Sequence, residues 1–294
     1  MKRFFLKDYC VACGNCIDVC PKGIIHFGTE ENEQGLTYVQ LTDETQCIQC
    51  RRCERVCPAG AVNYSEAEEP EEMRWMKREN LPAHHGCPVG VIARTLTRAI
   101  LRAGMADRAV IFKGSKTEFS TKFEQYDYAT PEEYVTEALA FKRAHPDRIV
   151  ILHYTDARAT SHEYAKEMLT HLEDERITVI HGIDLFRPEQ ERVGIAQGAC
   201  HLPEAVARSG KASFIARGSV LTSEEIRMSE QYIERALRLQ ADGAPFSLVE
   251  ITYPCYYRLM GRPTEQVTHE ERQKLRVWFH DYVEAEFPNG IIKE

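Results

Sequence analysis

The chain has 294 residues, of which 43% are hydrophobic, and this is enough for roughly two domains with apolar cores. A formal net charge of -8, without a clustered basic face, argues against a nucleic-acid-binding protein. No stretch approaches the roughly 20 consecutive apolar residues of a membrane span, and the start of the chain leads into a cysteine motif instead of the apolar part of a signal peptide. We therefore expect a cytoplasmic protein without a membrane span.

Eight of the eleven cysteines lie before residue 58, in two runs with the same spacing. The runs contain Cys10, Cys13, Cys16 and Cys20, then Cys47, Cys50, Cys53 and Cys57, and a proline follows each run. This regular spacing is typical of thiolate ligands in a reducing compartment and fits disulfide geometry poorly. The runs therefore indicate a duplication whose halves bind metal.

The spacing C-x2-C-x2-C-x3-C-P is typical of proteins with two 4Fe-4S clusters, in which the fourth cysteine of each run reaches the other cluster. It predicts one cluster on Cys10, Cys13, Cys16 and Cys57, and a second on Cys47, Cys50, Cys53 and Cys20. Two zinc sites are the alternative, but they leave the fourth cysteine and its proline unexplained. Residues 1–65 resemble the two-cluster ferredoxins of bacteria, and this resemblance implies low reduction potentials.

Three segments surround the cysteine runs. Residues 24–27 and 36–41 alternate apolar and polar side chains about a turn and predict a β-hairpin between the runs. Arg51 and Arg52 adjoin Cys50, where their charge either raises the potential of one cluster or is simply solvated. Residues 66–82 begin with an acidic, proline-containing stretch, which we interpret as an exposed linker.

From residue 83 onward, helical and strand patterns alternate. Helices are expected at 91–101, 131–143, 161–172, 204–208 and 223–239, each followed by a short apolar strand, at 109–112, 148–152, 177–180, 212–215 and 246–251. Short apolar strands separated by helices imply a parallel sheet that is covered on both faces. Residues 83–294 therefore predict a larger α/β domain with a doubly wound, mostly parallel sheet, closed by a helix at 270–286.

Several segments of this domain resemble, in chain order, the thiamine-diphosphate-binding β subunit of 2-oxoacid:ferredoxin oxidoreductases. They lie at 84–96, which begins His-His-Gly-Cys-Pro, and at 109–114, 138–147, 211–218 and 246–255. The resemblance spans residues 84–258. It implies a thiamine-diphosphate-binding fold, partner subunits, and a two-fold symmetric hetero-oligomer.

The sequence departs from this family at the cofactor. Family members typically hold magnesium and diphosphate with a Gly-Asp-Gly-Asp turn and an Asn pair, whereas the corresponding turns here, at 152–157 and 181–185, lack those glycines and the Asn. Asp156 and Asp184 remain as magnesium ligands if thiamine diphosphate is bound. We expect thiamine diphosphate and Mg to be absent and the domain to act as a scaffold.

The family also binds a cluster near its cofactor through four cysteines. Only Cys87 and Cys255 have counterparts, while His84 and Thr117 stand where two others are expected. We therefore expect this cluster to be lost. Cys87, Cys255 and Cys200 are then interpreted as small residues of the core.

The leading hypothesis is an electron-transfer subunit of a 2-oxoacid:acceptor oxidoreductase-type complex. Its two 4Fe-4S clusters would relay electrons to ferredoxin or another acceptor, and its degenerate thiamine diphosphate domain would dock partner subunits. Two alternatives stay open. The chain is itself the catalytic β subunit, which oxidises a 2-oxoacid to an acyl-CoA with magnesium on Asp156 or Asp184, or it is a redox-sensing or assembly protein. The sequence identifies neither the substrate nor the final electron acceptor.

Overall fold

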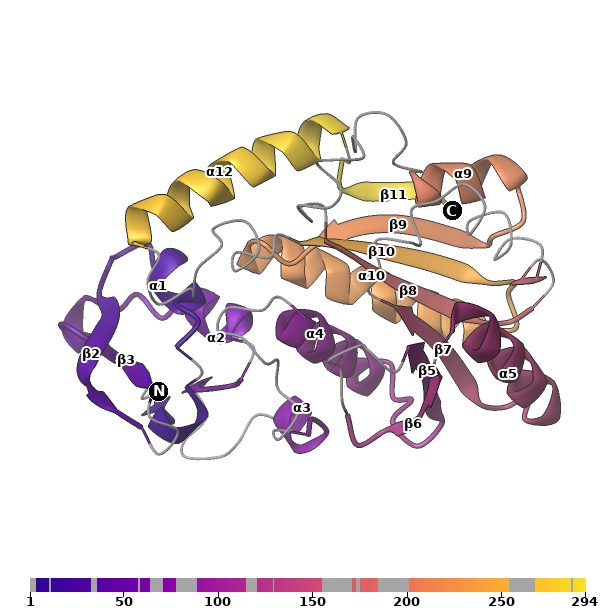
Figure 1. Cartoon of the computed structure of the whole chain (residues 1–294), viewed down its shortest axis with the longest axis horizontal. Coiled ribbons are helices and arrows are strands. Elements are labelled where there is room, and N and C mark those ends of the chain that lie inside the picture. The colour runs from indigo at the N-terminus through magenta and orange to yellow at the C-terminus, as the bar shows by residue number, and fades with distance from the viewer. Residues whose placement is uncertain are drawn as a thin grey trace.

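The structure is a computed structural model that describes residues 4–10, 12–32, 36–57, 59–63, 71–77, 89–114, 121–128, 130–154, 171–172, 175–184, 201–253, 268–286 and 288–294. A small N-terminal module lies beside a larger α/β domain (Figure 1). The C-terminal helix α12 (His269–Glu286) begins beside the module, where it contacts the first helix α1, and extends back to the larger domain.

The N-terminal module, residues 4–63, is built from two similar halves. Its strands form two small antiparallel sheets, in which β1 pairs with β4 and β2 pairs with β3. The elements are β1 (Phe4–Phe5), η1 (Lys7–Tyr9), α1 (Asn15–Asp18), β2 (Ile25–Glu31), β3 (Thr37–Leu41), η2 (Glu44–Gln46), α2 (Arg52–Val56) and β4 (Val62–Asn63). The hairpin of β2 and β3 confirms the one predicted between the cysteine runs.

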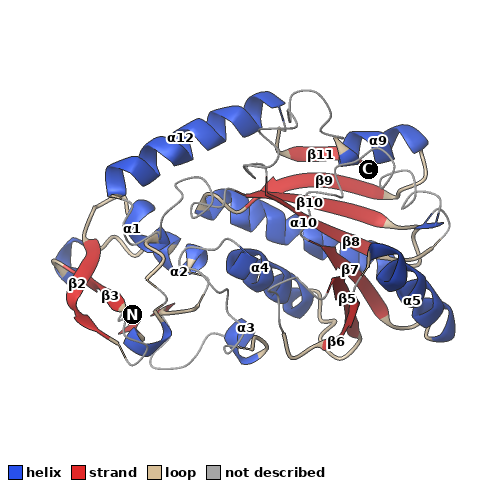
Figure 2. Cartoon of the chain, in the orientation of Figure 1, coloured by secondary structure: helices blue, strands red, loops and turns tan. Residues whose placement is uncertain are grey.

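A seven-stranded sheet forms the centre of the larger domain, in the order β11-β9-β10-β8-β7-β5-β6. The strands from β9 to β6 in this order run parallel, and β11 joins one edge antiparallel to β9 (Figure 2). The strands are β5 (Ala109–Gly114), β6 (Glu124–Tyr128), β7 (Ile149–Tyr154), β8 (Thr178–Asp184), β9 (Phe214–Ser219), β10 (Ser247–Tyr253) and β11 (Gly290–Lys293). The predicted mostly parallel α/β fold is confirmed.

Helices cover both faces of this sheet. They are α4 (Val89–Arg102) and α10 (Ser223–Ala241) on one face, and α5 (Pro131–Ala144) and α9 (Leu202–Ser209) on the other. Successive residues of a strand point to opposite faces, so Ile111 packs in the core with α4 and α10, while Phe112 packs in the core with α5 and α9. None of the described helices is long and apolar enough to cross a membrane.

Two of these helices begin with a capping box. The Thr130 hydroxyl accepts a hydrogen bond from the Glu133 N–H at 3.3 Å, and the Glu133 carboxylate accepts one from the Thr130 N–H at 3.0 Å. Thr222 and Glu225 form the same pair of bonds, at 3.2 and 2.6 Å. Each box satisfies donors that the first turn of a helix leaves unpaired. The second box fixes the start of α10, where that helix meets the N-terminal module.

Both edge strands were missing from the sequence-based expectations, and two central strands are longer than expected. The β6 segment, Glu124–Tyr128, is too polar to be recognised as an apolar strand. Residues 152–154 and 181–184 were expected to lie in turns, but they continue β7 and β8. His181, for example, is paired in register with Tyr154 and Glu250 on its two sides. Polar side chains that bond to each other inside the sheet allow these strands to extend.

The prediction of an exposed linker over residues 66–82 is wrong for the described part of that segment, residues 71–77. Helix α3 (Glu71–Arg74) begins there, and Glu72, Met73 and Met76 are buried. Trp75 stacks on Phe123 of the larger domain with ring centroids 4.7 Å apart. The acidic composition suggested exposure, but the methionines supply apolar surface and arginines of α4 neutralise Glu72.

The N-terminal module is fixed to the larger domain by polar contacts at α1 and α2. Arg272 Nε of α12 lies 3.0 Å from both carboxylate oxygens of Asp18. The Gln273 amide donates a hydrogen bond to the Asp18 carbonyl at 3.0 Å. In the second half, Arg55 donates to the Ser223 hydroxyl at 2.9 Å, at the first residue of α10. Both halves of the module therefore contact the larger domain.

Candidate metal centre

All eight cysteines of the two runs lie in the N-terminal module, and the structure forms no disulfide between them. The buried ones are Cys10, Cys13, Cys16, Cys53 and Cys57; Cys20 and Cys47 are half-buried, and Cys50 is exposed. Four of the buried thiols, those of Cys10, Cys16, Cys53 and Cys57, belong to one apolar cluster that fills the module between its two halves. Cys20 and Cys47 pack against the same cluster, so six of the eight sequence-predicted ligands lie together.

The two cysteine loops have the same backbone conformation. Ala12 and Gln49, just before the second cysteine of each loop, have φ angles of 51° and 53°. Gly14 and Arg51, just after it, have φ angles of 72° and 58°. Left-handed residues other than glycine are uncommon, so their recurrence at equivalent positions reflects a backbone path common to both halves. Alternating left-handed residues turn successive N–H groups to one side and form a cradle for an anionic group.

Backbone donors reach several of the thiols. The Ala61 N–H donates to Cys57 Sγ at 3.2 Å, and the Gln49 N–H donates to Cys47 Sγ at 3.4 Å. Cys13 accepts a backbone hydrogen bond from Asn15. Such N–H to sulfur bonds stabilise thiolates and tune the potentials of iron-sulfur clusters. The loops thus provide the donors that a cluster with a negative charge requires.

Thiols from the two halves converge. Burial is the main cause that raises the pKa of Cys13 and Cys16, and the charge of Cys57 from the other half raises the pKa of both further. The pKa of Cys10 is also raised by burial, with a smaller contribution from Cys57. Buried thiolates that repel one another require cationic metal to remain ionised together. The donor set of Cys10, Cys13, Cys16 and Cys57 therefore fits an iron-sulfur cluster.

A single metal ion is a different case. Within the described parts of the chain, no three His, Cys, Asp or Glu side chains gather as closely as the ligands of one ion. A 4Fe-4S cluster binds each thiolate through a different iron, so its ligands stand farther apart than those of a zinc ion.

A buried arginine of the larger domain supports the second cysteine loop. Arg94 of α4 donates hydrogen bonds to the backbone carbonyls of Glu54, at 2.7 Å, and Cys57. Its Nε and Nη2 also donate to one carboxylate oxygen of Glu72, at 2.9 and 2.7 Å. Burial opposes ionisation of Glu72, but Arg94 and Arg98 outweigh it and lower the pKa of Glu72 to about 2. The sequence analysis missed Arg94 as a supporting residue, although an arginine within an otherwise apolar helical segment is a recognisable signal.

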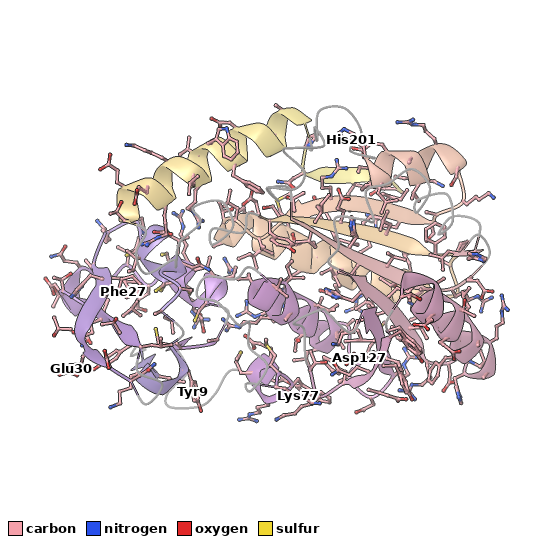
Figure 3. All side chains as sticks on the ribbon, in the orientation of Figure 1. Tyr9, Phe27, Glu30, Lys77, Asp127 and His201 are labelled. Atoms are coloured by element: carbon pink, nitrogen blue, oxygen red, sulfur yellow. The ribbon has the colours of Figure 1, made fainter. Side chains whose placement is uncertain are left out.

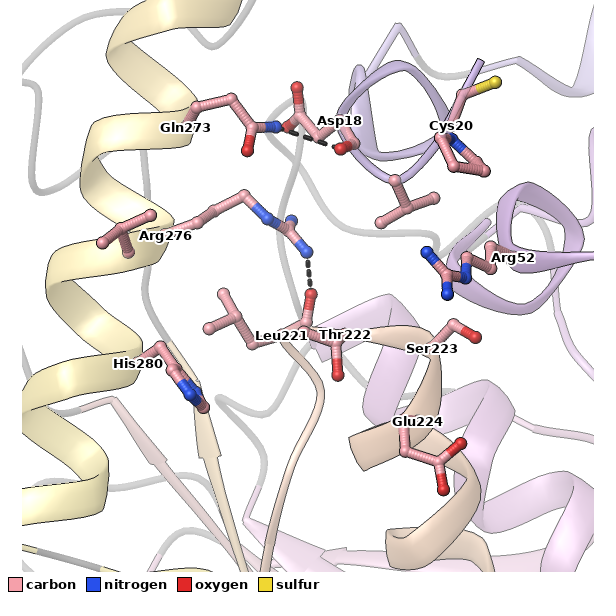
Figure 4. A pocket seen from close by; sticks show the side chains of 13 residues that line it. Asp18, Cys20, Arg52, Leu221, Thr222, Ser223, Glu224, Gln273, Arg276 and His280 are labelled. Atoms are coloured by element: carbon pink, nitrogen blue, oxygen red, sulfur yellow. Dashed lines mark hydrogen bonds between the residues drawn. The ribbon is translucent and has the colours of Figure 1, made fainter. Parts of the chain in front are cut away.

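A recess lies between α12, the end of the first cysteine run, Arg52 of α2 and the start of α10. It is a cavity of about 540 Å³ between the two parts of the protein. Arg52 of α2 and Arg276 of α12 point toward it from opposite sides, and Cys20 lies at its rim (Figure 4). Arg276 also donates to the carbonyl of Leu221, which precedes the start of α10. The recess thus adjoins a predicted ligand of the second cluster.

A buried polar network lies in the sheet, at a place that the sequence analysis did not single out. Arg217 Nε of β9 donates to Glu250 of β10 at 2.7 Å, and its two Nη atoms donate to Glu204 of α9 at 2.6 and 2.7 Å. His181 Nδ1 of β8 lies 3.0 Å from the other Glu250 oxygen. In the sequence, the signal for this network was a charged residue within each of the apolar strands at 214–219 and 247–253.

Further basic groups are buried at the carboxyl ends of β5 and β7. Lys113 Nζ lies 2.9 Å from the carboxylate of Asp127, its register partner on β6. Asp127 is labelled in Figure 3. Burial is the main cause that lowers the pKa of His153 to about 3, and the charges of Lys113 and His181 lower it further. His153 is therefore neutral at physiological pH. Ligands of open α/β sheets bind at this edge, so these side chains border the region where the resemblance would place a cofactor.

The predicted cofactor residues are only partly described. Asp184 ends β8 at the carboxyl edge of the sheet. Asp156, the other predicted magnesium ligand, lies outside the described residues, as do His84, Cys87, Thr117, Cys200 and Cys255.

Residues 9–61 match the family described as 4Fe-4S dicluster domain, and this match includes all eight cysteines of the runs. A search of curated proteins finds no match. Among solved structures, the chain is similar to 2-oxoglutarate:ferredoxin oxidoreductase from Magnetococcus marinus, solved with 2-oxoglutarate, coenzyme A and succinyl-CoA bound. The TM-score is 0.50 at 14% identity, over 65% of this chain and 70% of that chain.

A second similarity is to an enzyme from Mycobacterium smegmatis described as thiamin diphosphate-dependent. Its TM-score of 0.36, at 11% identity over 55% of this chain and 32% of that chain, is below the level at which two folds correspond. The resemblance inferred from the sequence is confirmed by the first similarity and the family match. The chain thus joins a 4Fe-4S dicluster domain to an α/β domain with a fold similar to that of 2-oxoglutarate:ferredoxin oxidoreductase.

Proposed function

We propose that this chain is the electron-transfer subunit of a 2-oxoacid:acceptor oxidoreductase-type complex. Two 4Fe-4S clusters would carry electrons one at a time from a catalytic partner subunit to ferredoxin or another acceptor. The observation that carries the proposal is the fixed position of the dicluster module against the larger domain. Polar contacts hold the module to Ser223, the first residue of α10 just beyond the carboxyl end of β9, and to Arg272 of α12.

This position suits electron transfer away from a site at the edge of the sheet. In open α/β sheets, ligands bind outside the carboxyl ends of the strands. The module meets the larger domain beyond the carboxyl end of β9, so a relay on the module would accept electrons released nearby. Rigid attachment keeps donor and acceptor at a constant separation, which the buried pair of Arg272 and Asp18 supports.

Within the module, we assign one cluster to Cys10, Cys13, Cys16 and Cys57, and the other to Cys47, Cys50, Cys53 and Cys20. The clusters would supply one-electron redox chemistry when bound. The chain's own residues fix the thiolates through the left-handed loops, donate N–H groups to sulfur, and exclude water from the first set. The eight thiolates require a reducing compartment, and we place the protein in the cytoplasm.

We assign residues 1–65 to the dicluster domain, 66–82 to a connecting segment, and 83–294 to a scaffold domain that docks partner subunits in a two-fold symmetric hetero-oligomer. In this proposal thiamine diphosphate and Mg bind elsewhere in the complex. The buried basic groups Lys113 and His153 at the carboxyl ends of β5 and β7 support the assignment, since a magnesium site favours acidic and carbonyl ligands.

The amounts of iron and thiamine diphosphate per chain test this function. The native complex is purified without oxygen, and both are measured together with the subunit stoichiometry. About eight irons per copy of this chain are expected, with thiamine diphosphate in a partner subunit only. Thiamine diphosphate in stoichiometric amounts at this subunit, lost from the variant Asp184→Asn, would instead identify the chain as the catalytic subunit.

A second measurement separates electron transfer from redox sensing. A relay passes electrons from the reduced catalytic partner to an acceptor at a rate that matches turnover of the complex. A sensor changes its binding to partners when its clusters are oxidised, without such a flux. Stopped-flow reduction of the clusters by the 2-oxoacid and coenzyme A, in the intact complex, therefore decides between them.

A further inference from the structure

The two cysteine loops share a backbone conformation but differ in their surroundings. Every described residue from Cys10 to Cys16 is buried. α12 covers this first loop, because a Cβ atom added to Gly14 would lie 3.1 Å from the guanidinium carbon of Arg272. In the second loop, Ile48 is 57% exposed and Cys50 is also exposed. The second cysteine loop therefore reaches the surface, whereas the first is enclosed by the rest of the protein.

The sequences of the two loops differ in a way that matches their exposure. Gly14 and Asn15 of the buried loop correspond in the repeat to Arg51 and Arg52 of the exposed loop. The side chain of Arg51 is 49% exposed and lies 4.0 Å from Glu54. A chain with a net charge of -8 thus presents two adjacent cations beside its exposed cysteine. Such a local reversal of charge attracts an acidic partner and steers its approach.

The recess extends this surface on the side of Cys20. Arg52 lines it, and so does Val277 of α12, whose side chain is 59% exposed. The surface thus includes two exposed apolar side chains, Ile48 of the second loop and Val277, which lines the recess together with Arg52. A patch with apolar contacts, cations and a concave centre has the features of a protein-docking surface.

We propose that the surface formed by Ile48, Cys50, Arg51, Arg52 and the adjoining recess is the docking site for an acidic redox protein, and that electrons leave through the cluster on Cys47, Cys50, Cys53 and Cys20. This inference rests on the proposed electron-transfer function. In each encounter the outer cluster loses one electron and the partner's cluster gains it, and no covalent bond forms or breaks. The cluster under α12 is then the inner one, which receives electrons from the rest of the complex.

The test reverses the charge of the patch. The double variant R51E/R52E is compared with R143E/R208E, which makes the same charge change on α5 and α9, at the far end of the larger domain from the module (Figure 1). The probe is a purified acidic 2Fe-2S ferredoxin, whose visible absorbance differs from that of 4Fe-4S clusters. The purified complex is first reduced with dithionite and then freed of excess reductant. Stopped-flow absorbance gives the second-order rate constant for reduction of the probe as a function of salt. Iron content and EPR spectra of the clusters confirm that each variant is loaded.

At low salt, R51E/R52E is expected to lower the rate constant about tenfold or more, and the difference should shrink as salt screens the charges. R143E/R208E should behave like the wild type. A change in cluster potential cannot produce the same result, because negative charge lowers the potential and makes the cluster a stronger donor. Reduction of the small cation methyl viologen should not slow in R51E/R52E.

Equal, salt-independent rates for wild type and R51E/R52E would overturn the docking site while leaving the relay intact. Loss of the partner subunits from the R51E/R52E complex would also overturn the docking site, because the patch would then be an interface within the complex. Failure of the wild type to reduce either the ferredoxin or methyl viologen would instead count against the proposed electron-transfer function itself.

Discussion

Arg272 Nε lies 3.0 Å from both carboxylate oxygens of Asp18, although the two residues come from opposite ends of the chain. The two side chains are 3% and 0% exposed. Desolvated charges of this kind depend on each other, because either one alone is buried without compensation. This pair therefore couples the stability of α12 to that of the cysteine module.

Asp18→Asn should destabilise the docked module by about 3–5 kcal/mol, because it leaves the Arg272 guanidinium buried without its carboxylate. Urea unfolding of the cluster-loaded protein, followed without oxygen by cluster absorbance, measures the change. The matched control is Arg227→Gln, which removes an ion pair with Glu224 on the exposed face of α10 and should leave the midpoint unchanged. Equal midpoints for Asp18→Asn and the wild type would show that the contact does not hold the module.

Glu72→Gln should lower the free energy of unfolding at pH 7 by on the order of 3 kcal/mol, because the pKa of Glu72 falls from 4.5 to about 2 in the folded protein. A carboxylate with a lowered pKa stabilises the fold fully above pH 4.5, and this stabilisation is lost as the pH falls toward 2. Urea unfolding followed by tryptophan fluorescence detects the change, since Trp75 is close in the chain. The exposed neighbour Glu71 provides the control, and Glu71→Gln should leave stability within the error of the measurement.

Buried His153 should make the protein less stable as the pH falls below 6.5. Its pKa is lowered from 6.5 to about 3 in the folded protein, so the unfolded chain binds a proton in this interval and the folded chain does not. The free energy of unfolding should fall by about 1.4 kcal/mol per pH unit, or by about 2 kcal/mol between pH 6.5 and 5. His153→Phe should flatten the part of the pH dependence that this group causes, whatever its effect on stability at pH 7.

The measurement is urea unfolding at several pH values from 7 to 5. His26→Gln, at an exposed histidine of the hairpin, serves as the control and should keep the wild-type slope. A His153→Phe slope that matches the wild type would show that His153 does not titrate as expected.

Pairs of cysteine substitutions should reveal which thiolates share a cluster. Cys57→Ser and Cys13→Ser are each expected to damage the cluster of the first set, so the double variant should lose no more iron than either single one, about four of eight. The double variant C57S/C50S should lose about all eight irons, because the two residues belong to different clusters. Iron analysis and EPR after anaerobic reconstitution provide the readout. The opposite pattern would mean that each run binds its own cluster.

The sequence determined the features that depend on local spacing. The cysteine runs identified the dicluster module because three ligands of each cluster lie within one short loop, so their spacing is a local property. The central strands and the helices α4, α5, α10 and α12 were predicted for the same reason, since periodicity within a segment decides which side chains it can bury. The edge strand β6 escaped because its pairing with β5 uses backbone groups that its polar sequence does not reveal.

Only the tertiary structure decided how the two equivalent halves differ. The cysteine loops have the same spacing, but α12 from the far end of the chain packs against the first loop at Gly14, while the second loop stays exposed. Contacts such as those of Arg94 with Glu72, or of Arg272 with Asp18, bring together charges whose cost of burial is repaid only in the folded chain. No local pattern specifies them, because the free energy of a buried charge depends on the partner that the complete fold places beside it.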